Sequence, residues 1–236
     1  MIPEPSGILL IDKPGGWTSH DVVAFTRKFF PRKTKVGHSG TLDPMATGLL
    51  VLLVGRATKT AASYQGLSKV YTGTFRLGVE TDTGDIEGRI LNEKTVPAIS
   101  ESELRGRLQS YRGDVELPIP KFSAVKHKGK PLYAYARKGE ETPEKRRTTR
   151  IDSWDLLSWT TPEASFRVAC ASGTYVRALT TDLGQKIGCA AVLSALRRES
   201  VGDYKVSEAI DIDGLKRAKE AVFERLLPPA KATDNA

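Results

Sequence analysis

Residues 37–59 read GHSGTLDPMATGLLVLLVGRATK and join a loop-forming sequence directly to an apolar one. Residues 37–48 contain three glycines and a proline, which favour a tight loop of fixed shape. Residues 49–54 are the longest apolar run of the chain and predict a buried strand. The run is too short to cross a bilayer, because a membrane-spanning helix needs about 20 apolar residues. The pattern therefore places the short carboxylate of Asp43 at the rim of a rigid sheet. Asp-Pro is also a common turn-forming pair, so the pattern alone leaves the role of Asp43 open.

Around this segment the chain alternates between strand and helix signals. Apolar or alternating runs predict strands, and capping residues, prolines and glycines mark the ends of the helices. We expect strands at 7–12, 49–54, 70–79, 151–159 and 164–171, and helices from Thr18 or Ser19 to Pro31, after the capping box at 100–103, from Pro131 to Gly139, from Thr174 to Gly188, and within 211–227. Residues 31–48 show no period, and we interpret them as an anchored functional loop; residues 81–88 read as a polar turn. The prediction is one α+β domain over 1–229, with a mixed, largely antiparallel sheet flanked by helices and loops, and a frayed tail at 230–236.

The charge of the chain favours a polyanionic partner. Its 236 residues carry a formal net charge of +8, and residues 121–150 alone hold ten lysines and arginines against three acidic residues. A second cluster without acids is formed by Arg27, Lys28, Arg32, Lys33 and Lys35. Such concentration suits a nucleic-acid backbone, because each neutralised phosphate releases counterions.

Several kinds of chemistry lack a sequence signal. The chain has no GxxxxGK[ST] phosphate loop, no GxGxxG, no HExxH and no cluster of metal ligands. Cys170 and Cys189 have no zinc-ligand spacing and read as ordinary reduced thiols. The N-terminus lacks the regions of a signal peptide. We therefore expect a cytoplasmic protein with no membrane contact, no metal and no cofactor.

The 37–59 segment resembles the signature of the bacterial tRNA pseudouridine synthase B family. Four other stretches resemble further motifs of this family, in the same order: GILLIDKPGGWTS at 7–19, KVYTGTFRLGVETDTGD at 69–85, FSAVKHKGKPLYAYARKG at 122–139, and SGTYVRALTTDLGQKIGCAAVLSALRR at 172–198. The resemblance covers most of the chain. It implies the pseudouridine synthase fold and isomerisation of uridine-55 in the T-loop of tRNA, with the T-loop and T-stem as partner, no protein partner, and a monomeric enzyme.

The resemblance also implies three catalytic residues. Asp43 matches the aspartate of the family signature, Tyr71 the tyrosine that stacks on the target base, and Arg177 the arginine that pairs with the aspartate. Burial in a strand would also explain Tyr71. Arg177 lies in the first turn of its expected helix, where the macrodipole disfavours a cation, and this placement makes sense if a carboxylate lies opposite it.

Further positions match substrate-binding residues of the family. These are His38, which stacks within the remodelled T-loop, Tyr175 and Leu196, which line the base pocket, the basic positions Lys13 and Lys59, and Lys126 in the basic segment. Leu196 would equally suit an ordinary core position.

The implied reaction accounts for the missing cofactor motifs. Breaking the N1–C1′ bond, turning the uracil and joining C5 to C1′ oxidises nothing and transfers no group. A carboxylate stabilises the positive character that bond cleavage builds on the sugar, as in glycosidases. Asp43 would act either as nucleophile at C1′ or as base at C2′, and both roles stay open.

Three other interpretations compete with this one. They are a guide-RNA-dependent pseudouridine synthase, whose signature also reads SGTLDP, a non-catalytic tRNA-folding factor, and a plain nucleic-acid-binding module. The last explains the charge but not the aspartate loop. Only seven residues follow Pro229, so we expect the C-terminal RNA-binding (PUA) domain of many family members to be absent, which argues against the first.

Overall fold

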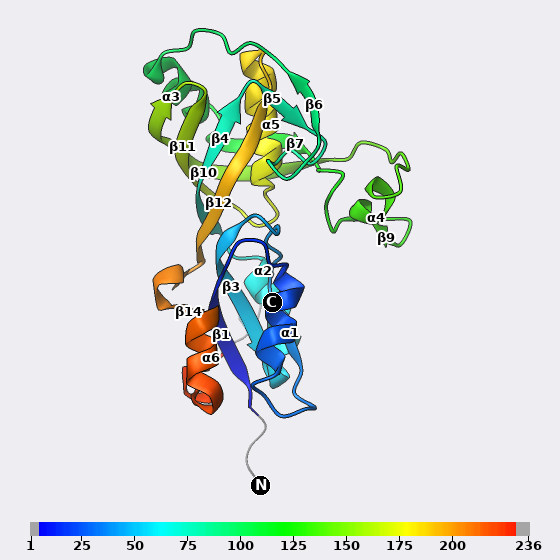
Figure 1. Ribbon diagram of the computed structural model, residues 1–236, viewed down its shortest axis with the longest axis vertical. Helices are drawn as coiled ribbons and strands as arrows, with labels where there is room; N and C mark the ends of the chain where they lie inside the picture. The colour runs from blue at the N-terminus through cyan, green and yellow to red at the C-terminus, as the bar shows by residue number, and fades with distance from the viewer. Residues whose placement is uncertain (1–4, 230–236) are drawn as a thin grey trace. The chain divides into compact units, whose positions relative to one another are not determined.

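The structure is a computed structural model that describes residues 5–229, except for the side chain at position 220. It divides into two compact units (Figure 1). Unit 1 contains the chain up to Tyr71 and from Leu196 onward, and unit 2 contains Thr72–Ala195. Among residues 5–229, no helix is long and apolar enough to span a membrane.

Unit 1 is a small mixed sheet with helices. Its strands are β1 (Gly7–Lys13), β2 (Val36–His38), β3 (Thr47–Val54), the second part of β12 (Ala191–Val201), β13 (Tyr204–Lys205) and β14 (Ile210–Asp211). Its helices are α1 (Ser19–Arg27), α2 (Ala61–Gln65) and α6 (Ile212–Ala218), with 3₁₀ turns η1 (Gly55–Thr60), η2 (Val206–Glu208) and η3 (Lys219–Arg225).

Strand β3 is the centre of unit 1. It pairs antiparallel with β1 along one edge, from Gly7 opposite Val54 to Lys13 opposite Gly48. On its other edge it pairs with β2 at one end and, in parallel, with β12 at the other. Both faces of this sheet are covered: one apolar cluster joins it to α1 and α6, and a second packs on the opposite face with η1 and α2 (Figure 1). This explains why residues 49–54 are continuously apolar rather than alternating.

Unit 2 is a mostly antiparallel sheet with the order β12-β4-β11-β10-β7. It contains β4 (Lys69–Leu77), which begins in unit 1, the hairpin β5 (Val79–Thr81) and β6 (Ile90–Glu93), β7 (Gly113–Pro118), the hairpin β8 (Lys126–His127) and β9 (Lys130–Pro131), β10 (Arg146–Thr160) and β11 (Glu163–Cys170). Its helices are α3 (Glu101–Gln109), α4 (Leu132–Ala136) and α5 (Val176–Ile187). The core is aromatic, with Trp154 in edge contact with Phe75, Phe166 and Tyr111.

The predicted fold class is confirmed, and so are several local signals. Thr18 and Ser100 cap α1 and α3 through capping boxes. Gly188 ends α5 in the left-handed conformation, with φ of 94°. Cys170 and Cys189 are free and buried. The predicted tail at 230–236 lies outside the described residues.

Four local predictions are wrong in detail. The 31–48 loop contains the three-residue strand β2, and the strand predicted at 70–79 ends at Leu77, because Gly78 has φ of 86°. Pro131 precedes α4 as its N-cap instead of entering its first turn. Strand β12 was not predicted as a strand; seven of its eleven residues are polar or small, and a buried arginine interrupts its apolar pattern.

Gly48 provides a test of the contact between β3 and β12. Its φ is 97°, and an added Cβ would lie 2.4 Å from the carbonyl oxygen of Arg198. We expect Gly48→Ala to lower the free energy of unfolding by about 3 kcal/mol, from backbone strain and overpacking together. Chemical denaturation measures this. Gly37→Ala, at an open position with ordinary φ on β2, is the matched control; equal losses in both variants would contradict the close approach.

Candidate active site

Asp43 lies in the irregular loop between β2 and β3 of unit 1, and its side chain is partly buried. The loop turns directly after it, because the Asp43 carbonyl accepts a hydrogen bond from the amide of Ala46 at 3.1 Å. The carboxylate is therefore carried by a short turn at the end of the most buried strand of the unit.

One side of this loop is held by the end of β1. The Lys13 side chain is fully buried, and its Nζ donates to the carbonyls of Pro14 at 2.9 Å, Trp17 at 2.6 Å and Pro44 at 3.1 Å. The amide of Gly16 donates to the same Pro44 carbonyl at 2.9 Å. The residue after Asp43 is thus fixed by two donors from the β1–α1 connection. Lys13 thereby contacts the backbone of the Asp43 loop.

A second support comes from the first residue of α1. The buried Ser19 hydroxyl accepts a hydrogen bond from the Leu42 amide at 2.9 Å and donates one to the Leu42 carbonyl at 3.2 Å. Both polar backbone groups of the residue before Asp43 are therefore satisfied by one side chain.

The other side of the loop is held by β12. Arg198 is only 2% exposed, and its Nε donates to the carbonyl of Leu49 at 2.7 Å. Its Nη2 donates to the carbonyl of Gly40 at 3.1 Å, and its Nη1 to that of Thr41 at 3.5 Å. One guanidinium thus joins the loop to strand β3.

His38 occupies the last position of β2, where the loop begins, and is partly buried. Burial lowers the pKa of its imidazole below the usual value, and the positive charges of Arg198 and His20 lower it further. Its Nδ1 accepts a hydrogen bond from the Gly40 amide at 3.4 Å. His38 therefore presents a neutral aromatic ring at neutral pH.

Tyr71 and Leu196 are the remaining candidates of unit 1. Tyr71 lies near the start of β4 and is 8% exposed, and Leu196 lies on β12 and is 7% exposed. Leu196 shares a face of β12 with Arg198, because alternate residues of a strand point to the same side. Lys59, in η1, is exposed.

Arg177 and Tyr175 belong to unit 2. Arg177 is 4% exposed; its Nη1 donates to the Thr83 carbonyl at 2.7 Å and its Nη2 to the Phe122 carbonyl at 3.0 Å. Its Nε lies 3.5 Å from Oδ2 of Asp85, which is itself buried. A carboxylate that the sequence analysis did not single out, that of Asp85, thus lies beside this cation within unit 2.

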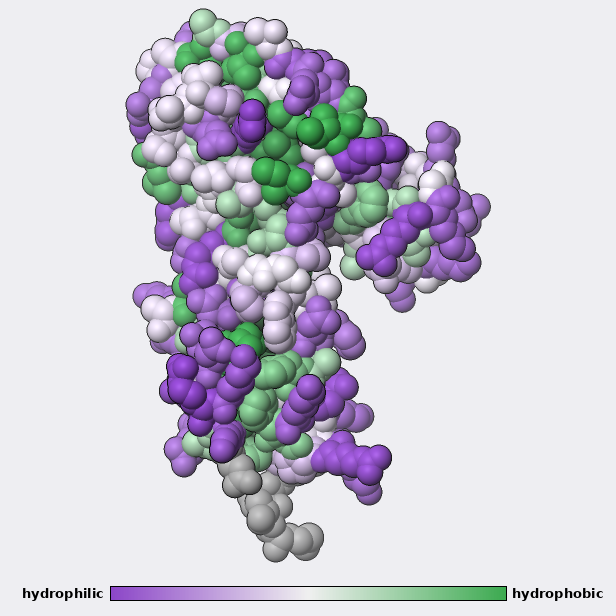
Figure 2. Space-filling view, in the orientation of Figure 1, coloured by the Kyte–Doolittle hydropathy of each residue, from purple (hydrophilic) through white to green (hydrophobic). Residues whose placement is uncertain are grey.

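Tyr175 precedes α5 as its N-cap and is partly buried. Together with Arg147 and Thr149 it lines a small hollow beside β7. Lys126 lies at the start of the exposed hairpin β8–β9, and its carbonyl accepts a hydrogen bond from Lys145. The surface formed by α4 and β9 is largely hydrophilic (Figure 2).

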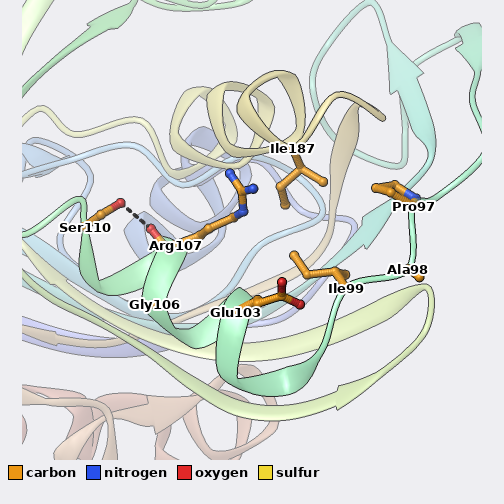
Figure 3. A pocket seen from close by; sticks show the side chains of 8 residues that line it. All are labelled: Pro97, Ala98, Ile99, Glu103, Gly106, Arg107, Ser110 and Ile187. Atoms are coloured by element: carbon orange, nitrogen blue, oxygen red, sulfur yellow. Dashed lines mark hydrogen bonds between the residues drawn. The ribbon is translucent and has the colours of Figure 1, made fainter.

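A larger cavity of unit 2 contains none of the candidates. It has a volume of about 380 Å³ and is lined by Pro97, Ala98, Ile99, Glu103, Gly106, Arg107, Ser110 and Ile187 (Figure 3). Its one carboxylate, Glu103, accepts hydrogen bonds from the amide and hydroxyl of Ser100 in the capping box, which lower its pKa. The Glu103 carboxylate therefore takes part in the N-terminal capping box of α3.

Among the residues that the structure describes, no three His, Cys, Asp or Glu side chains are grouped as a metal site. Three residues that hydrogen-bond or ion-pair with the candidate residues or with the Asp43 loop had no predicted role in the site. Asp85 lies in a run that we interpreted as a polar turn. Ser19 was one of two possible caps of the first helix, and Arg198 lies at the end of a family motif. A polar residue inside a family motif is the signal that would have marked each for attention.

Comparisons with known proteins identify the family of the chain. The sequence model of the TruB family pseudouridylate synthase N-terminal domain matches residues 27–176, and that of the tRNA pseudouridylate synthase B C-terminal domain matches residues 177–232. The chain belongs to the TruB family of pseudouridylate synthases. A tRNA pseudouridine synthase B from Opitutus terrae is 42% identical over 96% of this chain and 93% of the relative, and one from Nitratidesulfovibrio vulgaris is 39% identical over 96% and 73%.

Solved structures agree on the fold. A chain in the crystal structure of a Cbf5-Nop10-Gar1 complex matches 94% of this chain with a TM-score of 0.72 and 25% identity. This chain spans 60% of the length of that solved chain.

The buried pair of Arg177 and Asp85 gives a direct test of unit 2. Asp85→Asn removes the negative charge and leaves the buried guanidinium without it, so we expect the free energy of unfolding to fall by about 3 kcal/mol. Urea denaturation followed by circular dichroism measures the loss. Asp82→Asn, in the same turn but with the solvent-exposed partner Arg89, is the control and should change stability little. A loss no larger than that of the control would show that the pair does not stabilise the unit.

Proposed function

We propose that this chain isomerises uridine-55 in the T-loop of tRNA to pseudouridine, with Asp43 as its catalytic carboxylate. The observation that carries the proposal is the Asp43 loop, whose backbone is held on both sides by buried side chains in a member of the TruB family. A loop fixed before substrate binds is what a positioned carboxylate requires.

The reaction needs no added group. The N1–C1′ bond breaks, the uracil turns, and C5 forms a bond to C1′ while the proton on C5 is lost and N1 gains one. The ionised Asp43 would stabilise positive character at C1′, either by adding to that carbon or by removing the C2′ proton. We propose no cofactor and no metal.

The proposed base pocket uses the remaining candidates. Tyr71 would stack on the target uracil, and Leu196 and Tyr175 would form walls that keep the freed base from bulk water. Arg177 would pair with the carboxylate of Asp43. Its bonds to the carbonyls of Thr83 and Phe122 support this role, because they fix the guanidinium in one direction.

Binding of the RNA would rest on His38 and the basic residues. A flipped target base costs a few kcal/mol. The neutral ring of His38 suits stacking within the remodelled T-loop, and Lys13, Lys59 and Lys126 would add positive charge. We further propose that residues 1–229 form the catalytic domain and that the enzyme works as a monomer in the cytoplasm.

Conversion of unmodified tRNA tests the proposal. Wild-type protein should form pseudouridine at the T-loop position without added cofactor, and Asp43→Asn should lose at least about a thousandfold in rate, as expected when the reacting carboxylate is removed. Nucleoside analysis locates the product. Tight tRNA binding with no pseudouridine from either protein would favour the folding-factor alternative. Conversion only with a guide RNA would favour the guide-dependent one.

The hairpin β8–β9 provides a test of RNA contact. Lys128 and Lys130 are exposed and form no ion pair among residues 5–229, whereas Arg146 already pairs with Glu116 and Glu144. We expect the double variant Lys128→Gln/Lys130→Gln to weaken tRNA binding and to reduce the slope of log K against log salt by about 1.5, since each phosphate contact contributes about 0.7–0.9.

The control for this test is Arg217→Gln/Arg225→Gln, which removes two exposed charges from α6 and η3. Binding titrations at several salt concentrations measure both variants. An equal change of slope in both would show that only net charge matters.

A further inference from the structure

Arg198 is a buried cation whose known partners are backbone carbonyls. Its guanidinium donates to the carbonyls of Gly40, Thr41 and Leu49, and no carboxylate among residues 5–229 lies within 4.0 Å of it. Its neighbour Arg197 behaves differently: it is 38% exposed and binds Asp12 through two nitrogens, at 3.0 and 2.7 Å. The two adjacent arginines therefore bind different partners: Arg197 forms an ion pair with a carboxylate, and Arg198 binds backbone carbonyls.

A buried charge is costly unless hydrogen bonds compensate it. The planar guanidinium offers several donors in a fixed fork, so it can reach carbonyls on two segments at once. In Arg198 one edge of the fork faces strand β3 at Leu49, and the other faces the loop at Gly40 and Thr41. The fork therefore fixes the loop relative to the strand that follows it.

Strand β12 also carries Leu196, two residues before Arg198 and on the same face. The parallel pairing of Arg198 with Gly48 sets the register of this strand against β3. One strand thus holds both the proposed wall of the base pocket and the attachment of the catalytic loop.

We propose that Arg198 is a positioning residue, which holds the loop of Asp43 at a fixed distance from the base pocket without touching the substrate. This rests on the proposed function, because it takes Asp43 as the reacting carboxylate. Burial lowers the pKa of the nearby His38, and the positive charge of Arg198 lowers it further.

Two variants separate the shape of the fork from its charge. Arg198→Lys keeps the positive charge but loses the planar set of donors, and Arg198→Met loses both. We expect kcat for tRNA to fall about 30- to 100-fold in each, as for a misplaced catalytic group, while KM stays within about threefold. The pKa of His38, followed by NMR, should stay lowered in Arg198→Lys and rise in Arg198→Met.

The matched control is Arg197→Lys, which changes the adjacent arginine and should leave kcat near the wild-type value. All rates are measured well below the thermal midpoint of each variant, so that only folded enzyme contributes. A fall in kcat with a folded protein and unchanged KM supports the positioning role. A kcat equal to that of Arg197→Lys, or a loss that matches the unfolded fraction, would overturn it. If wild-type enzyme itself formed no pseudouridine, the proposed function would fail instead, and the NMR result would still report whether the charge of Arg198 acts on His38.

Discussion

The chain runs from Ser39 to Ala46 without helix or strand; the Ser39 amide donates to the Val51 carbonyl of β3, but the other backbone groups need partners that no regular ladder supplies. Buried side chains supply these partners: the ammonium group of Lys13, the hydroxyl of Ser19 and the guanidinium of Arg198. Hydrogen bonds from charged groups contribute about 1.5–3 kcal/mol each, roughly twice a neutral one. The loop is therefore held by interactions stronger than those of an ordinary surface turn, and the position of Asp43 depends on them.

These supports are only as rigid as the strands that carry them. Lys13 ends β1 and Arg198 lies in β12, and both strands pair with β3 where it leaves the loop. Because β3 is buried on both faces, its apolar side chains leave little freedom for the whole assembly to shift. Unit 2 also contains a buried cation that binds backbone carbonyls: Arg177 donates to the carbonyls of Thr83 and Phe122 and lies beside Asp85. In both units, buried cations organise irregular backbone.

Much of the fold follows from local sequence signals, whereas the supports of the site do not. Some local structures can be predicted from a few neighbouring residues. Examples are the apolar run of β3, the capping box at Ser100 and the glycine after α5. Asp43 is a candidate because the motif around it resembles a known family; its Asp-Pro pair alone would indicate a turn. Arg198 and Asp85 escaped prediction because their partners lie far away in the chain, and a charged residue in a sequence normally indicates an exposed surface. The burial of such a residue is a tertiary fact that no local pattern contains.

Hydrogen exchange of the free protein tests most directly whether the loop of Asp43 is held in place before RNA binds. The amides of Gly16, Leu42 and Ala46 donate to Pro44, Ser19 and Asp43, and each reports one point of attachment. We predict that these three amides exchange slowly, with protection approaching that of the paired amides of β1 and β3. Exchange within about tenfold of an unstructured peptide at all three positions would show that the loop opens freely, and would contradict a preformed site.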